Sequence, residues 1–142
     1  MRQALYYGSL WGGFSINGVG TGFPHPMGYL LTEYGGVPHG VACALFERAF
    51  LEQSLPQCPD KRERLLRITG GEAALFAVFE KLTKNDIALS EELCRKIETR
   101  LENAANTKRT LGEFSPAKGR AIAEQLFPKT QSGVEISGGW LF

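Results

Sequence analysis

Two histidines are the residues of this sequence whose type and position could do chemistry. His25 and His39 are the only histidines among the 142 residues, and each follows a proline at the expected start of a helix. The positive end of a helix dipole disfavours an imidazolium cation by roughly 0.3–1 kcal/mol. Neutral imidazole is the form that binds a divalent metal. Both side chains are therefore candidate metal ligands.

The spacing of the two histidines indicates how they could meet. A separation of fourteen residues (39 minus 25) is too long for adjacent turns of one helix, but it suits two helix starts joined by a turn at Gly35-Gly36. Two ligands do not complete a metal centre, for which proteins usually supply three or more. The sequence offers no third histidine and no carboxylate at an indicative spacing. The competing interpretation is a pair of hydrogen-bonded structural imidazoles.

Other candidate sites are weaker. Cys43 is expected in the middle of an apolar helix, where a thiol is usually inert. The run Gly18–Gly22 resembles a dinucleotide-binding loop, but Phe23 stands where the third glycine should be, and the loop follows a helix rather than a strand. Ser9 and Ser15 have no plausible local partners for a catalytic triad.

The elements that must position the histidines are predicted to be helices. The expected helices span about residues 3–16, from Pro26 to Gly35-Gly36, and 39–51. The third is apolar on every side in its first half, which predicts burial. The first contains several glycines, which favour close approach of another backbone, and its aromatic residues are expected in the core: Tyr6, Tyr7, Trp11 and Phe14.

The rest of the chain is predicted as helical scaffold. Asp60 is expected to cap a helix to about residue 68, and another helix is expected over 72–81. Ser90 is expected to cap the next, and Ser115-Pro116 to open the last, which stops at Pro128. The predicted fold class is all-α, a bundle of about six to seven helices. Residues 1–128 form the predicted helical domain, and 129–142 a Gly-rich tail in which only 134–136 suggest extended structure.

Composition excludes several classes of protein. A net charge of +1 gives no basic field for nucleic acid, and no apolar stretch is long enough for a membrane span. The three cysteines are an odd number without CxxC spacing, which is typical of reduced thiols in a cytoplasmic protein.

The segment Gly18 to Gly40 resembles the signature of the iron-containing alcohol dehydrogenases. In that family a glycine-rich turn leads to a histidine, and Pro-His-Gly follows fourteen residues later, as at His25 and His39. The resemblance implies the C-terminal helical domain of a dehydroquinate synthase-like fold, which follows a dinucleotide-binding domain in family members. It also implies Fe²⁺ or Zn²⁺ and NAD(P) as cofactors. The two histidines match the last two of the family's three histidine ligands.

The sequence departs from the family pattern in two respects. Tyr29 stands where many members carry a histidine near the substrate. A phenol can hydrogen-bond a substrate oxygen but does not titrate near neutrality, so Tyr29 is a possible substrate contact rather than a proton relay. The family's aspartate and first histidine ligand lie upstream, as does the cofactor domain, and we expect them to be absent from this chain. Phe14 and Phe23 are further candidates for the substrate wall.

The leading functional hypothesis is therefore the C-terminal metal-binding part of an NAD(P)-dependent alcohol dehydrogenase, inactive alone. The alternative is a non-catalytic helical assembly module derived from that family. A separately encoded N-terminal cofactor domain is a further expected partner, together with homo-oligomer formation.

Overall fold

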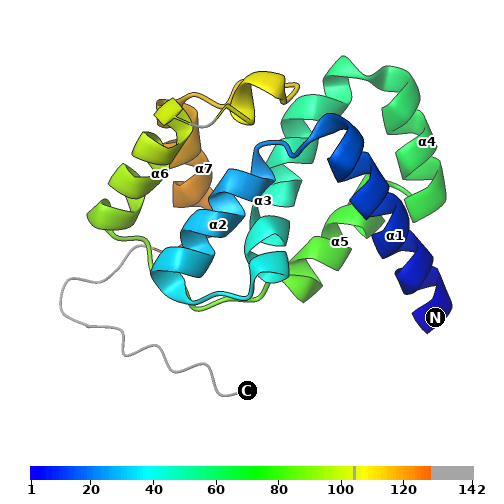
Figure 1. Cartoon of the computed structure of the whole chain (residues 1–142), viewed down its shortest axis with the longest axis horizontal. Helices are drawn as coiled ribbons and strands as arrows, with labels where there is room; N and C mark the ends of the chain where they lie inside the picture. Colours follow the sequence, from blue (N-terminus) through cyan, green and yellow to red (C-terminus); the bar gives the residue numbers. More distant parts are fainter. Residues whose placement is uncertain (104, 129–142) are drawn as a thin grey trace.

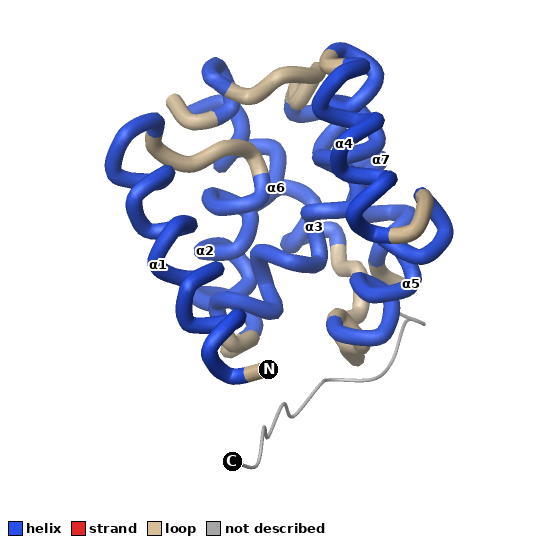
Figure 2. The backbone as a smooth tube through the Cα atoms, turned by 90° about the vertical axis from the view of Figure 1, so that its right-hand side faces the viewer, coloured by secondary structure: helices blue, strands red, loops and turns tan. Residues whose placement is uncertain are grey.

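The computed structural model describes residues 1–103 and 105–128, and this part of the chain is all-α (Figure 1). The prediction of an all-α fold is confirmed, and Figure 2 shows helices and loops without a strand over the described ranges. The predicted tail at 129–142, with its extended 134–136, lies outside the described residues. The helices are α1 Arg2–Val19, α2 Pro24–Gly35, α3 His39–Ser54, α4 Pro59–Thr69, α5 Glu72–Leu82, α6 Glu91–Asn103 and α7 Pro116–Leu126, with short 3-10 turns η1 Leu55–Gln57 and η2 Thr107–Arg109.

The core lies where α2 and α3 pack together and α6 and α7 close over them. Phe23, at the entrance to α2, is fully buried. Its ring stacks on Phe114 at a centroid distance of 4.1 Å and meets Phe46 edge-on at 5.8 Å. Aromatic pairs in these geometries stabilise a core beyond the area that they bury. This cluster fixes the position from which α2, and with it the first histidine, begins.

The predicted helix ends agree with the structure in most places. The Ser90 hydroxyl accepts a hydrogen bond from the Leu93 amide at 3.1 Å, as an N-cap does. Gly36 ends α2 in the left-handed region, with φ of 64°, a conformation that glycine adopts at little cost. The predicted cap at Asp60 is wrong: α4 begins at Pro59 and its N-cap is Cys58, so the Asp60 carboxylate lies in the first turn, two positions after the cap.

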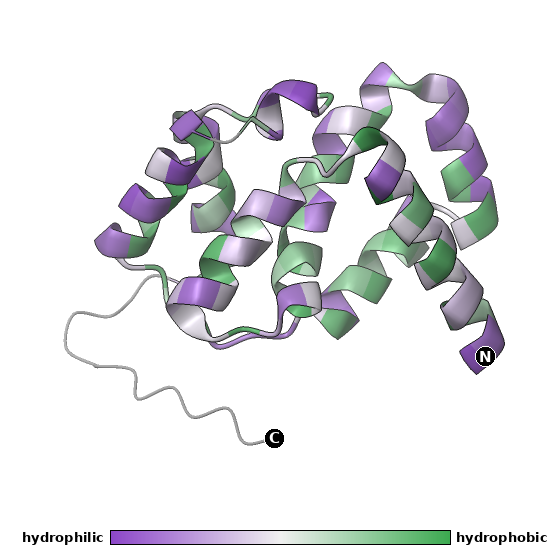
Figure 3. Ribbon diagram, in the orientation of Figure 1, coloured by the Kyte–Doolittle hydropathy of each residue, from purple (hydrophilic) through white to green (hydrophobic). Residues whose placement is uncertain are grey.

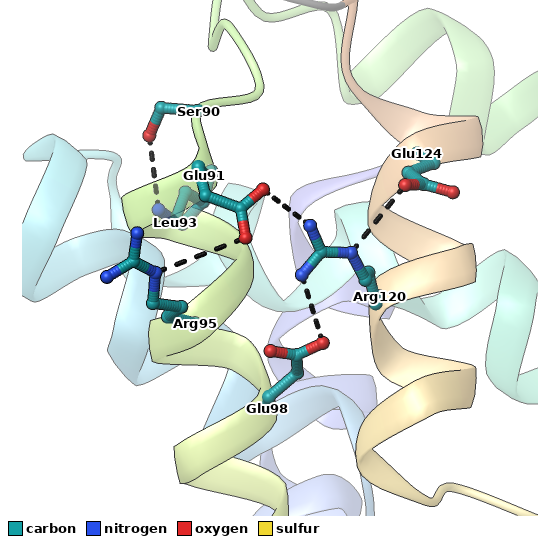
Figure 4. A network of polar contacts seen from close by, with 7 residues as sticks. All are labelled: Ser90, Glu91, Leu93, Arg95, Glu98, Arg120 and Glu124. Atoms are coloured by element: carbon teal, nitrogen blue, oxygen red, sulfur yellow. Dashed lines mark hydrogen bonds and ion pairs between the residues drawn. The ribbon is translucent and has the colours of Figure 1, made fainter.

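Helices α6 and α7 are joined by a buried apolar face and an ion-pair network above it (Figure 4). The guanidinium of Arg120 lies 2.5 Å from a Glu91 carboxylate oxygen and 3.1 Å from one of Glu98. Below it, a Cβ on Gly119 would lie 2.1 Å from the Leu101 side chain. Glycine therefore allows the close approach of the two helices.

Helix α1 differs from its prediction. None of its eighteen residues is buried, and Trp11 and Phe14 are 67% and 60% exposed. A Cβ on Gly8 or Gly12 would meet no atom within 4 Å. The expected core role of the aromatic residues, and the expected close approach of a backbone at the glycines, are therefore wrong within the described chain. The physical reason is that no other described helix packs against α1, although hydrophobic residues occur along its length (Figure 3).

Candidate metal centre

The two histidines come from separate helices and lie side by side. His25 is in the first turn of α2, and His39 is the first residue of α3. Their ring centroids are 5.0 Å apart and their planes nearly perpendicular, at 84°. The turn after Gly35 reverses the chain and makes α2 and α3 neighbours. The fold thus joins the helix starts that the fourteen-residue spacing indicated, while a metal role for the two imidazoles stays a prediction.

A third potential ligand, Cys43, completes the cluster. It lies one turn beyond His39 on α3, and its Sγ atom is 3.6 Å from the Nε2 atom of that histidine. One ligand atom from each of His25, His39 and Cys43 lies within 4.8 Å of the others. Over residues 1–103 and 105–128 no other such group of three or more histidine, cysteine or acidic residues occurs. Two imidazoles and a thiol are a donor set that suits a divalent transition metal.

Sequence reasoning missed Cys43 because the apolar helix around it indicated an inert thiol. The signal that could have identified it is the four-residue step from His39 to Cys43, since residues four apart share one face of a helix. That step would have placed the thiol beside the second histidine. It could not have placed the thiol near His25, which lies on another helix.

Gly28 makes room for the thiol at the crossing of α2 and α3. A Cβ at this position would lie 2.3 Å from the Cys43 sulfur and 3.0 Å from its backbone nitrogen. Any side chain on Gly28 would force the two helices apart or displace the thiol. The glycine therefore sets the geometry of the cluster without being a ligand.

A hydroxyl group lies beside one ring nitrogen of His39. The Thr32 hydroxyl donates its one hydrogen to the Gly28 carbonyl at 2.9 Å, so towards His39 Nδ1, 3.5 Å away, its oxygen can only accept. This arrangement favours the tautomer that carries its proton on Nδ1. In the neutral ring this leaves the lone pair on Nε2, the nitrogen that faces Cys43. Such a bond to the far nitrogen is how proteins commonly orient a histidine that binds metal.

The electrostatics of the cluster favour its neutral groups. Partial burial, and then the neighbouring His39, lower the pKa of His25. Burial, and then the carboxylate of Glu47, raise the pKa of the Cys43 thiol, and burial also raises the pKa of Glu47. Near neutral pH, His25 is therefore an uncharged imidazole and Cys43 an uncharged thiol. The imidazole is ready to bind a cation, whereas the thiol must first lose its proton.

The candidate substrate residues have different surroundings. The ring of Tyr29 lies 4.7 Å from His25 and 4.6 Å from His39, and it is 47% exposed. It therefore stands beside both imidazoles at the surface, and its role as a substrate contact stays a prediction. Phe23 is fully buried among core rings, so its expected place in a substrate wall is wrong. Phe14 is exposed on α1 and contacts only Trp11 among the rings described.

The glycine-rich run before His25 has a structural use. The backbone amide of Phe23 donates a hydrogen bond to the Thr110 hydroxyl at 2.9 Å, and the side-chain amide of Asn106 donates one to the Thr21 hydroxyl at 2.5 Å. A Cβ on Gly22 would lie 3.2 Å from the same Thr110 oxygen. These contacts tie the start of α2 to the segment between α6 and α7. The run thus holds His25 in place.

Two further expectations concern the whole described chain. All three cysteines are free thiols, as the odd number and spacing predicted. Within the described ranges no helix is both long and apolar enough to cross a membrane.

The fold and the cluster together define a helical unit that carries a candidate metal centre. A crystal structure of an iron-containing alcohol dehydrogenase from Thermotoga maritima is similar to this unit, with a TM-score of 0.68 and 31% sequence identity. The match covers 78% of this chain and 31% of that one, so the chain spans about a third of the length of that dehydrogenase. The resemblance expected from Gly18–Gly40 is thereby confirmed as a match to part of such an enzyme. No protein-family profile and no curated protein matches the sequence.

Proposed function

We propose that this chain is the C-terminal, metal-binding part of an iron-type, NAD(P)-dependent alcohol dehydrogenase. The observation that carries the proposal is the meeting of His25 and His39, 5.0 Å apart, in a chain that is similar to part of an iron-containing alcohol dehydrogenase. Both histidines lie at helix starts, and partial burial lowers the pKa of His25. Their donor chemistry suits Fe²⁺ and Zn²⁺.

The residues of the cluster would have distinct roles in the reaction. His25 and His39 would hold the metal, and Thr32, whose hydroxyl lies 3.5 Å from His39 Nδ1, would orient the ring of His39. When bound, the metal supplies a Lewis acid for the alcohol oxygen, and NAD(P) supplies the acceptor for the hydride. Tyr29 would donate a hydrogen bond to a substrate oxygen, and its ring contacts with both imidazoles support this role.

The metal-binding part of the proposal can be tested with the full 142-residue chain. Uptake of Fe²⁺ or Zn²⁺ at equilibrium is measured for the wild type and for His25→Ala and His39→Ala, with Glu63→Gln as the control. Glu63 is an exposed carboxylate on α4, so its removal reports nonspecific binding. We expect both histidine variants to lose specific uptake and the control to retain it. Unchanged uptake in both histidine variants would overturn the proposal.

The cofactor-binding part is proposed to come from outside residues 1–142. Its docking surface would be α1, whose exposed apolar side chains include Trp11 at 67% and Val19 at 76% exposure. Two observations support the cofactor-binding part as the partner that covers α1. No described helix packs on α1, and the matched dehydrogenase is about three times as long as the region matched. Exposed apolar surface of this extent favours association.

Two measurements test this arrangement. With Fe²⁺ or Zn²⁺ added, we expect no NAD(P)-dependent oxidation of short alcohols by the chain alone, so appreciable turnover would contradict the need for another part. Sedimentation velocity then compares the wild type with Trp11→Glu. If the wild type associates as its concentration rises and Trp11→Glu does not, the partner that covers α1 is a second copy of this chain. That result would favour the non-catalytic assembly module over the dehydrogenase hypothesis.

A further inference from the structure

We propose that Cys43 is a third metal ligand, so that the described chain by itself holds a divalent transition metal through two nitrogens and one sulfur. The inference rests on the proposed metal-binding function of His25 and His39. It adds a ligand type, and with it a preference among metals. The juxtaposition of His25, His39 and Cys43 within 4.8 Å is the observation behind it.

The distance between sulfur and nitrogen fits shared coordination. In a tetrahedral zinc site, bonds of about 2.3 Å to sulfur and about 2.0–2.1 Å to nitrogen separate these two atoms by about 3.5–3.6 Å. The Cys43 Sγ atom lies 3.6 Å from His39 Nε2. A metal can therefore join this pair with almost no movement of α3. The ligand atom of His25, on α2, lies within 4.8 Å of the other two, whereas two donors of one tetrahedral zinc site lie about 3.3–3.6 Å apart, so metal binding would draw His25 closer.

The surrounding residues turn the donor atoms towards one another. The tautomer that Thr32 favours places the His39 lone pair on Nε2, the nitrogen that faces the sulfur. Gly28 holds open the space that the thiol occupies. Cys43 and both histidines are only half-buried, so an ion can enter from solvent. Three protein ligands also leave a fourth position open, as catalytic zinc sites do.

The chemical step is a simple exchange. The S–H bond of Cys43 breaks, a sulfur–metal bond forms, and the proton passes to solvent, so that one proton is released for each metal bound. No oxidation or reduction is involved. Because thiolate is a soft ligand, the site should prefer Zn²⁺ and Co²⁺ to Mg²⁺ and Mn²⁺, which bind oxygen ligands.

The experiment uses Co²⁺ as the probe, because sulfur bonded to cobalt gives a charge-transfer absorption in the near ultraviolet. The full chain is titrated with Co²⁺ as wild type, Cys43→Ser and Cys58→Ser, and folding is checked by circular dichroism. Cys58 is the matched control, a half-buried free thiol outside the cluster. A second variant, Cys43→Ala, removes the side-chain donor altogether.

We expect the wild type and Cys58→Ser to show the sulfur–cobalt absorption. Cys43→Ser and Cys43→Ala should lose it, with an affinity lowered by about tenfold or more, the order seen when support for a metal site is removed. Displacement of Co²⁺ by equimolar Zn²⁺, but not by equimolar Mg²⁺, is the expected selectivity.

Two outcomes would separate this inference from the function on which it rests. If Cys43→Ser retains the wild-type spectrum and affinity while His25→Ala and His39→Ala lose binding, the thiolate ligand is excluded and the histidine site stands. If none of these substitutions alters Co²⁺ binding, both proposals are overturned.

Discussion

Gly28 on α2 faces the thiol of Cys43 on α3 so closely that a Cβ added to the glycine would lie 2.3 Å from the sulfur. We expect Gly28→Ala to lower the free energy of unfolding by about 1–3 kcal/mol, the usual cost of overpacking a fitted contact. Metal affinity should fall with it, because the thiol must move. Urea denaturation and Co²⁺ titration measure the two effects.

The control for this substitution is Gly40→Ala. Gly40 lies in the first turn of α3, and a Cβ there meets no atom within 4 Å. Alanine should be neutral or stabilising by up to about 1 kcal/mol, because it favours the helix. Equal effects of the two substitutions would show that the contact with Cys43 does not constrain the helix crossing.

Thr32 is expected to act on metal binding through His39. Thr32→Val keeps the shape of the side chain but removes the oxygen that accepts from Nδ1. We expect the metal affinity to fall by roughly 10- to 100-fold, as for other partners of metal-binding histidines. Thr69→Val is the matched control, since the Thr69 hydroxyl also donates to a carbonyl four residues earlier, that of Leu65. An equal loss of affinity in both variants would contradict the role of Thr32.

Glu47 should make the protein less stable as the pH rises. Burial raises the pKa of this carboxyl in the folded state, so the folded protein holds the proton more tightly than the unfolded chain. The free energy of unfolding should therefore fall as the pH rises from the unfolded pKa, about 4.3, through the folded one. Glu47→Gln should be more stable than the wild type at neutral pH, and the difference should vanish at acid pH.

The exposed Glu63→Gln serves as the control for Glu47. It should change the stability little, because this carboxylate is exposed on α4. Urea denaturation of the three proteins across the acid-to-neutral range gives the comparison. A Glu47→Gln variant that is less stable than the wild type at neutral pH would show that the carboxylate is stabilising.

The ion pair of Arg120 with Glu91 should make the protein less stable as the pH falls, the opposite of the dependence expected from Glu47. Its hydrogen bond and charge lower the pKa of Glu91, so this pair stabilises the fold above the unfolded pKa of the carboxyl and ceases to do so as the pH falls through the folded one. Arg120→Met should therefore lose stability at neutral pH and show a shallower loss on acidification. Lys118→Met, an exposed cation on the same helix, is the control. Identical acid-unfolding curves for wild type and Arg120→Met would rule out this coupling.

Local rules of helix formation gave most of the fold from the sequence. Ser90 and Gly36 mark helix ends by their own chemistry, which depends on neighbours within four residues. The same rules failed for α1, because apolar aromatic residues indicate burial without indicating what covers them. Trp11 is exposed since the described chain contains no element packed on its helix.

The candidate site was also only partly predictable from local sequence patterns. His25 and His39 were visible from their type, their spacing and their place at helix starts. Cys43 was passed over, because the sequence around it is that of a buried apolar helix, and Phe23 was assigned to a substrate wall although it fills the core. Which apolar residue faces a core and which faces a site depends on helix packing.

The sequence by itself determined the all-α class, most of the helix boundaries and the two histidines, since each follows from residues close together in the chain. Only the tertiary structure decided that the thiol joins them. Cys43 reaches His25 because α2 crosses α3 at Gly28, a glycine without a side chain at that point. That contact is a property of two helices in space, so no local pattern could specify it.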